Sequence, residues 1–214
     1  MYIKTSAENI AVYPQWQRPD IELVNSVAAY PSALISDARK RMDVMSSDIR
    51  CLTPGVRLAG AVLPIQIWEG DNLAIHRGLD EARAGDVLVV SGKGLVHRAV
   101  FGGILAEICL SKGVRGVIVD GAVRDIEELN EMGLAVFARA VVPAGPSQNG
   151  PGYVGKPVAC GGIVCSPGDA VIGDVDGIVV IPQSELLETL IALPGQEDLE
   201  QQIRGRISEV VLPS

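Results

Sequence analysis

Short apolar runs alternate with amphipathic segments through the middle of the chain. Three apolar runs are too short for helices, and each predicts a strand: Val87–Val90, Gly116–Asp120 and Ala135–Ala138. Ala99–Leu110 and Asp125–Gly133 lie between them and predict helices; in the second, acids occupy the first turn and apolar positions follow at every third residue. This alternation indicates a parallel sheet layer with right-handed crossovers.

Turn signals separate the elements expected upstream. A helix is predicted over Ile21–Ala29, a strand over Arg57–Val62 and a capped helix over Asp71–Leu79. The stretch Ser91–Gly94 is expected to be a loop, and it lacks the GxxxxGK[ST] pattern of a P-loop. Gly121 is expected to turn the chain after the strand that precedes it.

The pattern changes after Val141. A turn-rich loop, Pro143–Gly152, precedes short predicted strands at Val154–Val158, Gly161–Val164, Asp169–Ile172 and, after a tight turn, Ile178–Ile181. A helix is expected from Gln183, interrupted at Pro194 and resuming over Glu197–Ile207. We therefore predict a β-rich half joined to an α/β half in one layered domain.

Composition narrows the class of protein. Hydrophobic residues make up 48% of the 214 residues and aromatic residues only 4%, so the core must consist mainly of aliphatic side chains. A net charge of −8 without a basic cluster argues against direct nucleic-acid binding, because phosphates need cationic partners. Met1–Asp20 does not resemble a secretory signal and no apolar stretch reaches membrane-spanning length, so we expect a soluble cytoplasmic protein.

The four cysteines form no CxxC pair, and each lies next to apolar residues. Buried free thiols in a reducing compartment are therefore expected, rather than a zinc site or a disulfide framework.

Arg124 and Asp125 lie side by side between a predicted strand and a predicted helix. A guanidinium group can bind a carboxylate through two parallel hydrogen bonds, and a carboxylate is a ligand for Mg²⁺ or Mn²⁺. On spacing alone, such a pair is more often a surface ion pair beside a helix cap.

Segments along most of the chain carry the residues of a known family in the same order. They are Asp71–His76 (DNLAIH), Ala84–Val90, Val117–Asp125, Gly145–Gly152, Cys160–Gly162 and Pro167–Gly177. On these residues the chain resembles the RraA-like family, which includes the regulator of ribonuclease E activity A and the class II 4-hydroxy-4-methyl-2-oxoglutarate aldolases. The similarity runs from about Ser36 to Ile207.

The resemblance implies an α/β fold of the swivelling β/β/α type, with mixed and parallel sheet layers and flanking helices. It implies a single domain over residues 1–214, with a β/β/α core at about 36–182 and a C-terminal helical extension at 183–214 in a subunit interface. Members of the family assemble as trimers or hexamers with active sites between subunits.

The resemblance also implies a chemistry. The aldolases use Mg²⁺ or Mn²⁺ to stabilise the enolate of pyruvate; here Asp125 would be the metal ligand and Arg124 would bind the pyruvate carboxylate. The segment Gly102-Gly103-Ile104-Leu105 would complete the substrate site, with the backbone N–H groups of Ile104 and Leu105 as donors.

Two positions need separate consideration. Gly103 stands where the aldolase signature has an aspartate, although Glu128 fits the end of that signature, so efficient aldolase activity is in doubt unless another acid substitutes. The family also brings a glutamate from the C-terminal helix of a neighbouring subunit; Glu200 is the favoured match and Glu197 the alternative.

Three side chains compete for the role of proton acceptor or nucleophile. His76 lies on an apolar helix face and is predicted to be a hydrogen-bonded structural histidine, whereas His97 is expected near the pocket. Lys93 lies in a solvated loop, which disfavours a Schiff-base role.

The favoured function is thus a metal-dependent lyase that releases pyruvate from a 4-hydroxy-2-oxoacid, with oxaloacetate decarboxylation as a related activity. The alternative is a non-catalytic protein that binds and inhibits ribonuclease E. Assembly with copies of itself is expected under either hypothesis, and neither involves a membrane or direct contact with nucleic acid.

Overall fold

The computed structural model describes residues 7–211, with side chains through Ile207. The strands are β1 (Ile10–Val12), β2 (Arg50–Cys51), β3 (Leu58–Gln66), β4 (Asp86–Phe101), β5 (Gly116–Val123), β6 (Ala135–Val141), β7 (Gly152–Val154), β8 (Val158–Cys160), β9 (Ile163–Cys165), β10 (Ala170–Asp174) and β11 (Gly177–Ile181). The helices are α1 (Ile21–Ala28), α2 (Ser32–Ala38), α3 (Leu73–Glu81), α4 (Gly103–Ser111), α5 (Ile126–Glu131) and α6 (Leu186–Val211), with 3₁₀ turns at Ala7–Asn9 and Gln183–Glu185.

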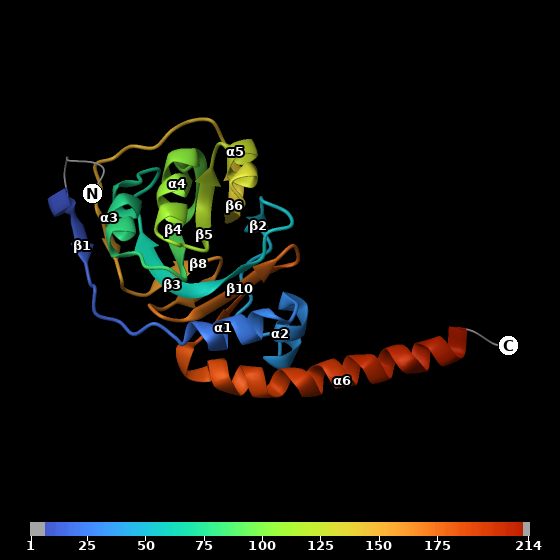
Figure 1. Ribbon diagram of the computed structural model, residues 1–214. Helices are drawn as coiled ribbons and strands as arrows, with labels where there is room; N and C mark the ends of the chain where they lie inside the picture. The colour runs from blue at the N-terminus through green and yellow to red at the C-terminus, as the bar shows by residue number, and fades with distance from the viewer. Residues whose placement is uncertain (1–6, 212–214) are drawn as a thin grey trace.

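A mixed sheet forms the centre of the molecule. Its main strand order is β1-β7-β3-β4-β5-β6-β2, and the β10–β11 hairpin pairs with β3. Strands β3, β4, β5 and β6 are mutually parallel, so the predicted parallel layer is confirmed, as is the α/β class with flanking helices. Figure 1 shows α3, α4 and α5 on one side of the sheet and α1, α2 and α6 on the other.

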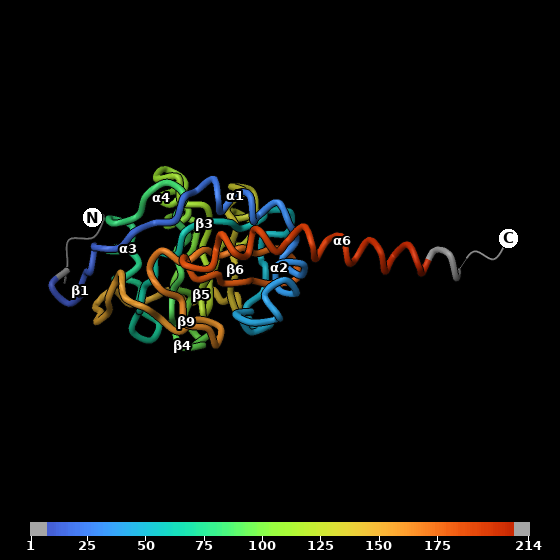
Figure 2. Tube along the Cα trace, turned by 90° about the horizontal axis from the view of Figure 1, so that it is seen from below, coloured from blue at the N-terminus to red at the C-terminus, as the bar shows by residue number. Residues whose placement is uncertain are grey.

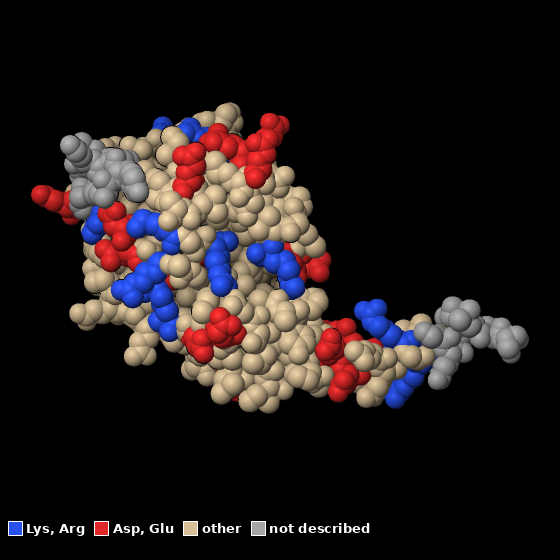
Figure 3. Space-filling view, viewed as in Figure 1, with Lys and Arg blue, Asp and Glu red and all other residues tan. Residues whose placement is uncertain are grey.

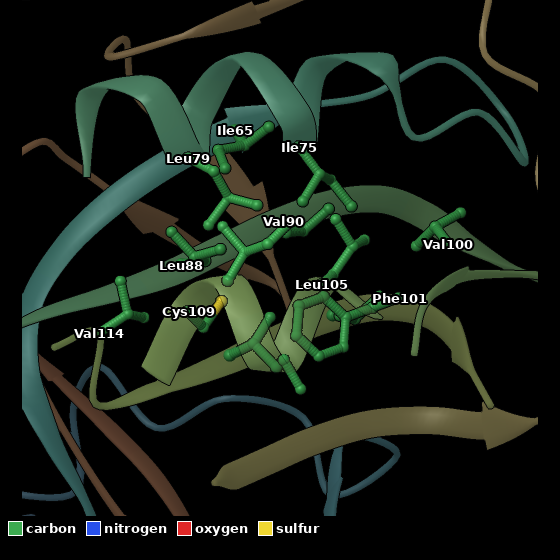
Figure 4. Close-up of a cluster of buried hydrophobic side chains, with 14 of the residues drawn as sticks. Ile65, Ile75, Leu79, Leu88, Val90, Val100, Phe101, Leu105, Cys109 and Val114 are labelled. Carbon is green, nitrogen blue, oxygen red and sulfur yellow. The ribbon is translucent and has the colours of Figure 1, made fainter. Parts of the chain in front are cut away.

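The largest apolar cluster lies between the sheet and helices α3 and α4. It includes Leu88 and Val90 of β4, Ile75 and Leu79 of α3, and Leu105 of α4 (Figure 4). Every residue of β5 is buried, which explains why this strand is an almost continuous apolar run in the sequence. This packing fixes the carboxyl ends of β4 and β5 against the start of α4.

The expected loop at Ser91–Gly94 and the expected helix start at Ala99 are wrong. Both segments belong to β4, which continues to Phe101, and α4 begins only at Gly103. Three shifts in the β4–β5 register absorb the extra residues while pairing continues, and Lys93 and Gly94 adopt positive φ at the bend. Gly121 likewise does not end its strand, because β5 runs on to Val123.

The strand expected over Val154–Val158 is also wrong. Strand β7 ends at Val154 and β8 starts at Val158, because Gly155 turns the chain at φ 84°. The tight turn before Ile178 is confirmed: Asp174 pairs with Gly177 in the β10–β11 hairpin.

Helix α6 departs from prediction because it continues through Pro194. Proline lacks the N–H that would bond four residues back, but one missing bond can be tolerated within a helix that is anchored elsewhere. Leu186 and Leu193 are buried against the body and provide that anchor. Beyond them the helix projects from the body (Figures 1 and 2).

All four cysteines are free thiols, as predicted, but only Cys109, Cys160 and Cys165 are buried, whereas Cys51 is half-buried. Burial raises the pKa of the Cys109 and Cys165 thiols to about 12 and that of Cys160 well above its usual value. Among the helices that the structure describes, none is both long and apolar enough to cross a membrane.

Candidate functional site

A cavity of about 320 Å³ opens where β4 and β5 meet their following helices. One wall comes from the end of β4 and the start of α4, and the Arg124–Asp125 turn closes the adjacent side. The opposite side comes from the start of α3 and the loop that carries Pro146 and Gln148. The carboxyl ends of parallel strands are the usual place for ligand sites in α/β folds.

Asp125 faces the start of α4 in a conformation that few non-glycine residues adopt. Its backbone lies in the left-handed region (φ 61°, ψ 40°), and its Oδ2 accepts a hydrogen bond from the N–H of Gly103 at 3.1 Å. A Cβ at Gly102 would overlap this oxygen, so the close approach requires glycine there. Backbone strain of this kind, of order 1–3 kcal/mol, often marks functional sites.

Arg124 lies beside Asp125, with 3.4 Å between Nε and Oδ2. Its Nη1 would lie 2.9 Å from a Cβ at Gly145, so the loop after β6 passes close to the guanidinium group. The side chains of the pair are 39% and 37% exposed and both line the cavity. A cation and an anion are therefore accessible to a ligand at the same end of the cavity.

Helix α4 directs its first turn at the same place. Leu105 is buried in the cavity wall and Ile104 borders the opening with 72% of its surface exposed. N–H groups in the first turn of a helix have no partner within the helix, so those of Ile104 and Leu105 can bind an anionic group.

Glu128 occupies the space beside Gly103. A Cβ on Gly103 would overlap Oε2 and Cδ of Glu128 and would lie 2.7 Å from Oε1. The Glu128 carboxylate thus lies against a backbone position whose N–H is bonded to Asp125. Sequence spacing alone does not indicate this contact, because it depends on how α5 packs on α4.

The far side of the cavity is polar and uncharged. Asn72 and His76 line it, and both are buried, with 5% and 6% of their surfaces exposed. Asn72 Oδ1 and His76 Nδ1 have no hydrogen-bond partner, so the prediction of a hydrogen-bonded structural histidine is wrong for this ring nitrogen. Burial lowers the pKa of His76, which favours the neutral imidazole.

Asp71 holds this side of the cavity together. Its Oδ1 accepts the N–H of Leu73, which caps α3, and its Oδ2 accepts the hydroxyl of Ser147 at 2.9 Å and the N–H of Asn149 at 2.6 Å. One buried carboxylate therefore links the start of α3 to the long loop that borders the cavity.

The other candidates lie outside the cavity. His97 is exposed on β4 and does not line the cavity, although Ala99 and Val100, which follow it on the same strand, do. Lys93 is also exposed, with its ammonium group 5.5 Å from the centre of the Trp68 ring. Glu197 and Glu200 lie on α6 and do not line the cavity of the same chain.

A divalent cation fits this site only as a partly hydrated ion. No group of three or more His, Cys, Asp or Glu side chains suited to a metal occurs among the residues that the structure describes. Asp125, with Glu128 nearby, instead offers one or two carboxylates, which is how Mg²⁺ is commonly held together with several waters.

Known proteins are similar to this chain in sequence and in fold. The model of the RraA-like family, described as Aldolase/RraA, matches residues 32–180. The chain is 39% identical over 127 residues to the 4-hydroxy-4-methyl-2-oxoglutarate aldolase of Thermus thermophilus, which covers 59% of this chain and 77% of that protein. It is 33% identical over 166 residues, 78% of this chain and 79% of the relative, to a Halalkalibacterium halodurans protein that bears the same name provisionally.

A solved structure matches over a larger part of the chain. Streptomyces coelicolor RraAS2, described as an unusual member of the RNase ES inhibitor RraA protein family, superposes with a TM-score of 0.78 at 31% identity. The match covers 88% of this chain and 100% of that one.

Proposed function

The chain belongs to the RraA-like family, and from this premise we propose that it is a lyase that cleaves a 4-hydroxy-2-oxoacid to release pyruvate. The substrate is of the 4-hydroxy-4-methyl-2-oxoglutarate type, as the names of its relatives indicate. The observation that carries the proposal is the accessible Arg124–Asp125 pair, which lies beside the first turn of a helix at one end of a cavity. The same site would decarboxylate oxaloacetate, because both reactions pass through the enolate of pyruvate.

Each residue at the charged end has a role in this proposal. Arg124 binds the carboxylate of the 2-oxoacid through its guanidinium group. The N–H groups of Ile104 and Leu105 bind the other end of the pyruvate portion of the substrate. Gly102 keeps this end of the cavity open, because a side chain there would overlap Asp125. Asp125 holds Mg²⁺ or Mn²⁺, which when bound supplies a Lewis acid for the 2-oxo group.

Glu128 supplies the second acid of the site in this proposal. Its carboxylate lies against Gly103, the position where the aldolase signature carries an aspartate. A carboxylate near a hydrated cation accepts hydrogen bonds from its waters and orients them. The retained acid of α5 then occupies the space that a side chain at position 103 would fill.

The proposed function is tested by measuring pyruvate release with lactate dehydrogenase as the coupling enzyme. We expect turnover of 4-hydroxy-4-methyl-2-oxoglutarate and of oxaloacetate with Mg²⁺ or Mn²⁺, and its loss on addition of EDTA. Release no faster than in a control with metal but without protein, on both substrates, would refute the lyase.

We further propose that α6 packs on a second copy of the chain as part of a trimer or hexamer and delivers Glu200 to the neighbouring site. Its exposed apolar side chains lie four or eight residues apart and so follow one ridge, which is interrupted at Gly195: Leu187, Ile191, Leu199, Ile203 and Ile207. Ridges with this spacing pack into the grooves of a partner helix. Figure 3 shows that acidic side chains precede basic ones along the projecting part, which suits pairing with another copy.

Charged substitutions on this ridge test the assembly. The double substitution Leu199→Glu and Ile203→Glu is expected to convert the oligomer to monomers, because burying two carboxylates costs several kcal/mol. Light scattering after size-exclusion chromatography measures the mass. Arg206→Glu is the matched control at an exposed position off the ridge. A wild-type monomer, or an oligomer unaffected by the double substitution, would contradict the proposal.

Inhibition of ribonuclease E is the second candidate function. The description of the Streptomyces structure as a member of an RNase ES inhibitor family favours it. Its test is cleavage of a labelled RNA by purified ribonuclease E with and without the protein. Inhibition that persists in an Asp125→Ala variant would separate this function from the lyase site.

A further inference from the structure

We propose that Asp71 is a positioning residue of this site. It holds the β6–β7 loop, residues 142–151, where Gln148 contacts the part of the substrate that leaves. The inference rests on the proposed function and adds to it the residues that select the substrate beyond its pyruvate portion.

The β6–β7 loop borders the cavity from its charged end to the start of α3. Near the beginning of the loop, the backbone oxygen of Ala144 accepts the N–H of Ala99 on β4 at 2.8 Å. The next residue, Gly145, passes close to the guanidinium group of Arg124. Farther along, Gln148 is exposed and lines the cavity, and its side-chain amide can both donate and accept hydrogen bonds from a ligand.

Asp71 bonds to the residues on either side of Gln148. Its Oδ2 accepts the hydroxyl of Ser147 at 2.9 Å and the N–H of Asn149 at 2.6 Å. Its Oδ1 accepts the N–H of Leu73 in the first turn of α3 at 2.9 Å. Only 1% of Asp71 is exposed, so water competes little for these bonds. The carboxylate therefore fixes where the backbone of Gln148 lies relative to α3.

The bonds to the loop go beyond what a helix cap requires. One side-chain oxygen is enough to cap a helix, and Oδ1 of Asp71 does so for α3. Backbone bonds between Ser147 and the segment before α3 hold the loop ahead of Gln148. The bond from Asn149 to Asp71 holds the loop after Gln148, so the contact residue is held in place before a ligand arrives.

The place of Gln148 in the cavity indicates which part of the substrate it contacts. In the proposed function Arg124 binds the carboxylate of the pyruvate portion, so the leaving part extends toward the β6–β7 loop. C4 of 4-hydroxy-4-methyl-2-oxoglutarate carries hydroxyl, methyl and carboxylate groups, whereas oxaloacetate ends at C4. Gln148 thus contacts groups that only the longer substrate has, and the loop favours that substrate.

The test compares the two substrates in the full-length protein. Gln148→Ala is expected to lower the ratio of kcat/KM for the longer substrate to kcat/KM for oxaloacetate about tenfold, mainly through a higher KM for the longer one. Asp71→Ala should lower the ratio to a similar extent, because Gln148 is then no longer held in place. In the double variant the ratio should be no lower than in Gln148→Ala, since Asp71 acts through Gln148.

Asp174→Ala is the matched control for the loss of a bonded carboxylate. Like Asp71, Asp174 accepts two backbone N–H groups and one serine hydroxyl, from Ser32 and Asp176, but it does not line the cavity. This variant should lower the Tm and keep the wild-type ratio. Ser147→Ala removes one bond to Asp71, leaves the α3 cap intact and should lower the ratio by a smaller factor.

The positioning role has clear contrary results. A wild-type ratio in Asp71→Ala or in Gln148→Ala would overturn it, as would losses that multiply in the double variant. If Asp71→Ala does not fold, a wild-type ratio in Ser147→Ala would overturn it instead. A wild-type protein inactive on both substrates would refute the proposed function itself.

Discussion

Replacing Asp125 by alanine is expected to lower kcat/KM for pyruvate release at least about a thousandfold, equivalent to about 4 kcal/mol of transition-state stabilisation. The reason is that, within the described part of the chain, Asp125 is the only carboxylate that both lines the cavity and bonds to the first N–H of α4. Other acids on α5 are available nearby, but they do not line this cavity. The substitution should therefore remove the proposed cation site rather than weaken it.

Metal binding can be measured without turnover. The affinity for Mn²⁺, followed by the relaxation of water protons, should fall together with activity in Asp125→Ala. Glu107→Ala removes an exposed acid from α4 outside the cavity and is the matched control. It is expected to keep both the Mn²⁺ affinity and the activity of the wild type. Wild-type Mn²⁺ affinity in Asp125→Ala would show that the cation binds elsewhere. Full activity in that variant would exclude Asp125 from the chemistry.

The sequence predicts the centre of this fold well because its signals are local. Strand β5 is entirely buried and forms an apolar run, and α5 combines acids in its first turn with apolar Ile126, Leu129 and Met132. These features require no knowledge of the rest of the chain. They also place Arg124 and Asp125 between a strand and a helix, so local sequence signals are sufficient to locate the charged end of the cavity.

Other features depend on contacts between distant segments. The sequence of β4 contains a glycine-rich stretch that would form a loop in isolation, but pairing with β5 keeps it in the sheet through bulges. Helix α6 tolerates Pro194 because Leu193 beside it is buried against the body. In both cases the local sequence favours a loop or a break, and tertiary packing overrides that preference.

The polar side of the cavity illustrates the same limit. His76 has the sequence environment of a core histidine, and its burial agrees with that interpretation. Its missing partner depends on the placement of all the atoms around the ring, which no local pattern specifies. The contact of Glu128 with Gly103 is of this kind as well, since it joins two helices separated by β5.

That contact leads to the second large expected effect, which concerns Gly103→Asp. The new Cβ would overlap the Glu128 carboxylate, so the glutamate must move away from the site. The backbone itself accepts the change, because Gly103 does not adopt positive φ and an acid is favourable in the first turn of α4. We expect activity to fall about tenfold to a hundredfold, as when an outer partner of a metal site is displaced. Glu128→Ala alone should cause a similar loss.

A double variant tests whether positions 103 and 128 can each supply the same carboxylate to the site. If a single carboxylate is needed beside Asp125, Gly103→Asp combined with Glu128→Ala should recover most of the wild-type kcat/KM, because the aspartate then has room to replace the glutamate. Glu131→Ala, an exposed acid on the same helix, is the control and should neither reduce activity nor rescue Gly103→Asp. Losses that simply multiply in the double variant would mean that the residues act independently. Recovery would mean that one carboxylate beside Asp125 is sufficient for activity, whether it comes from position 103 on α4 or from Glu128 on α5.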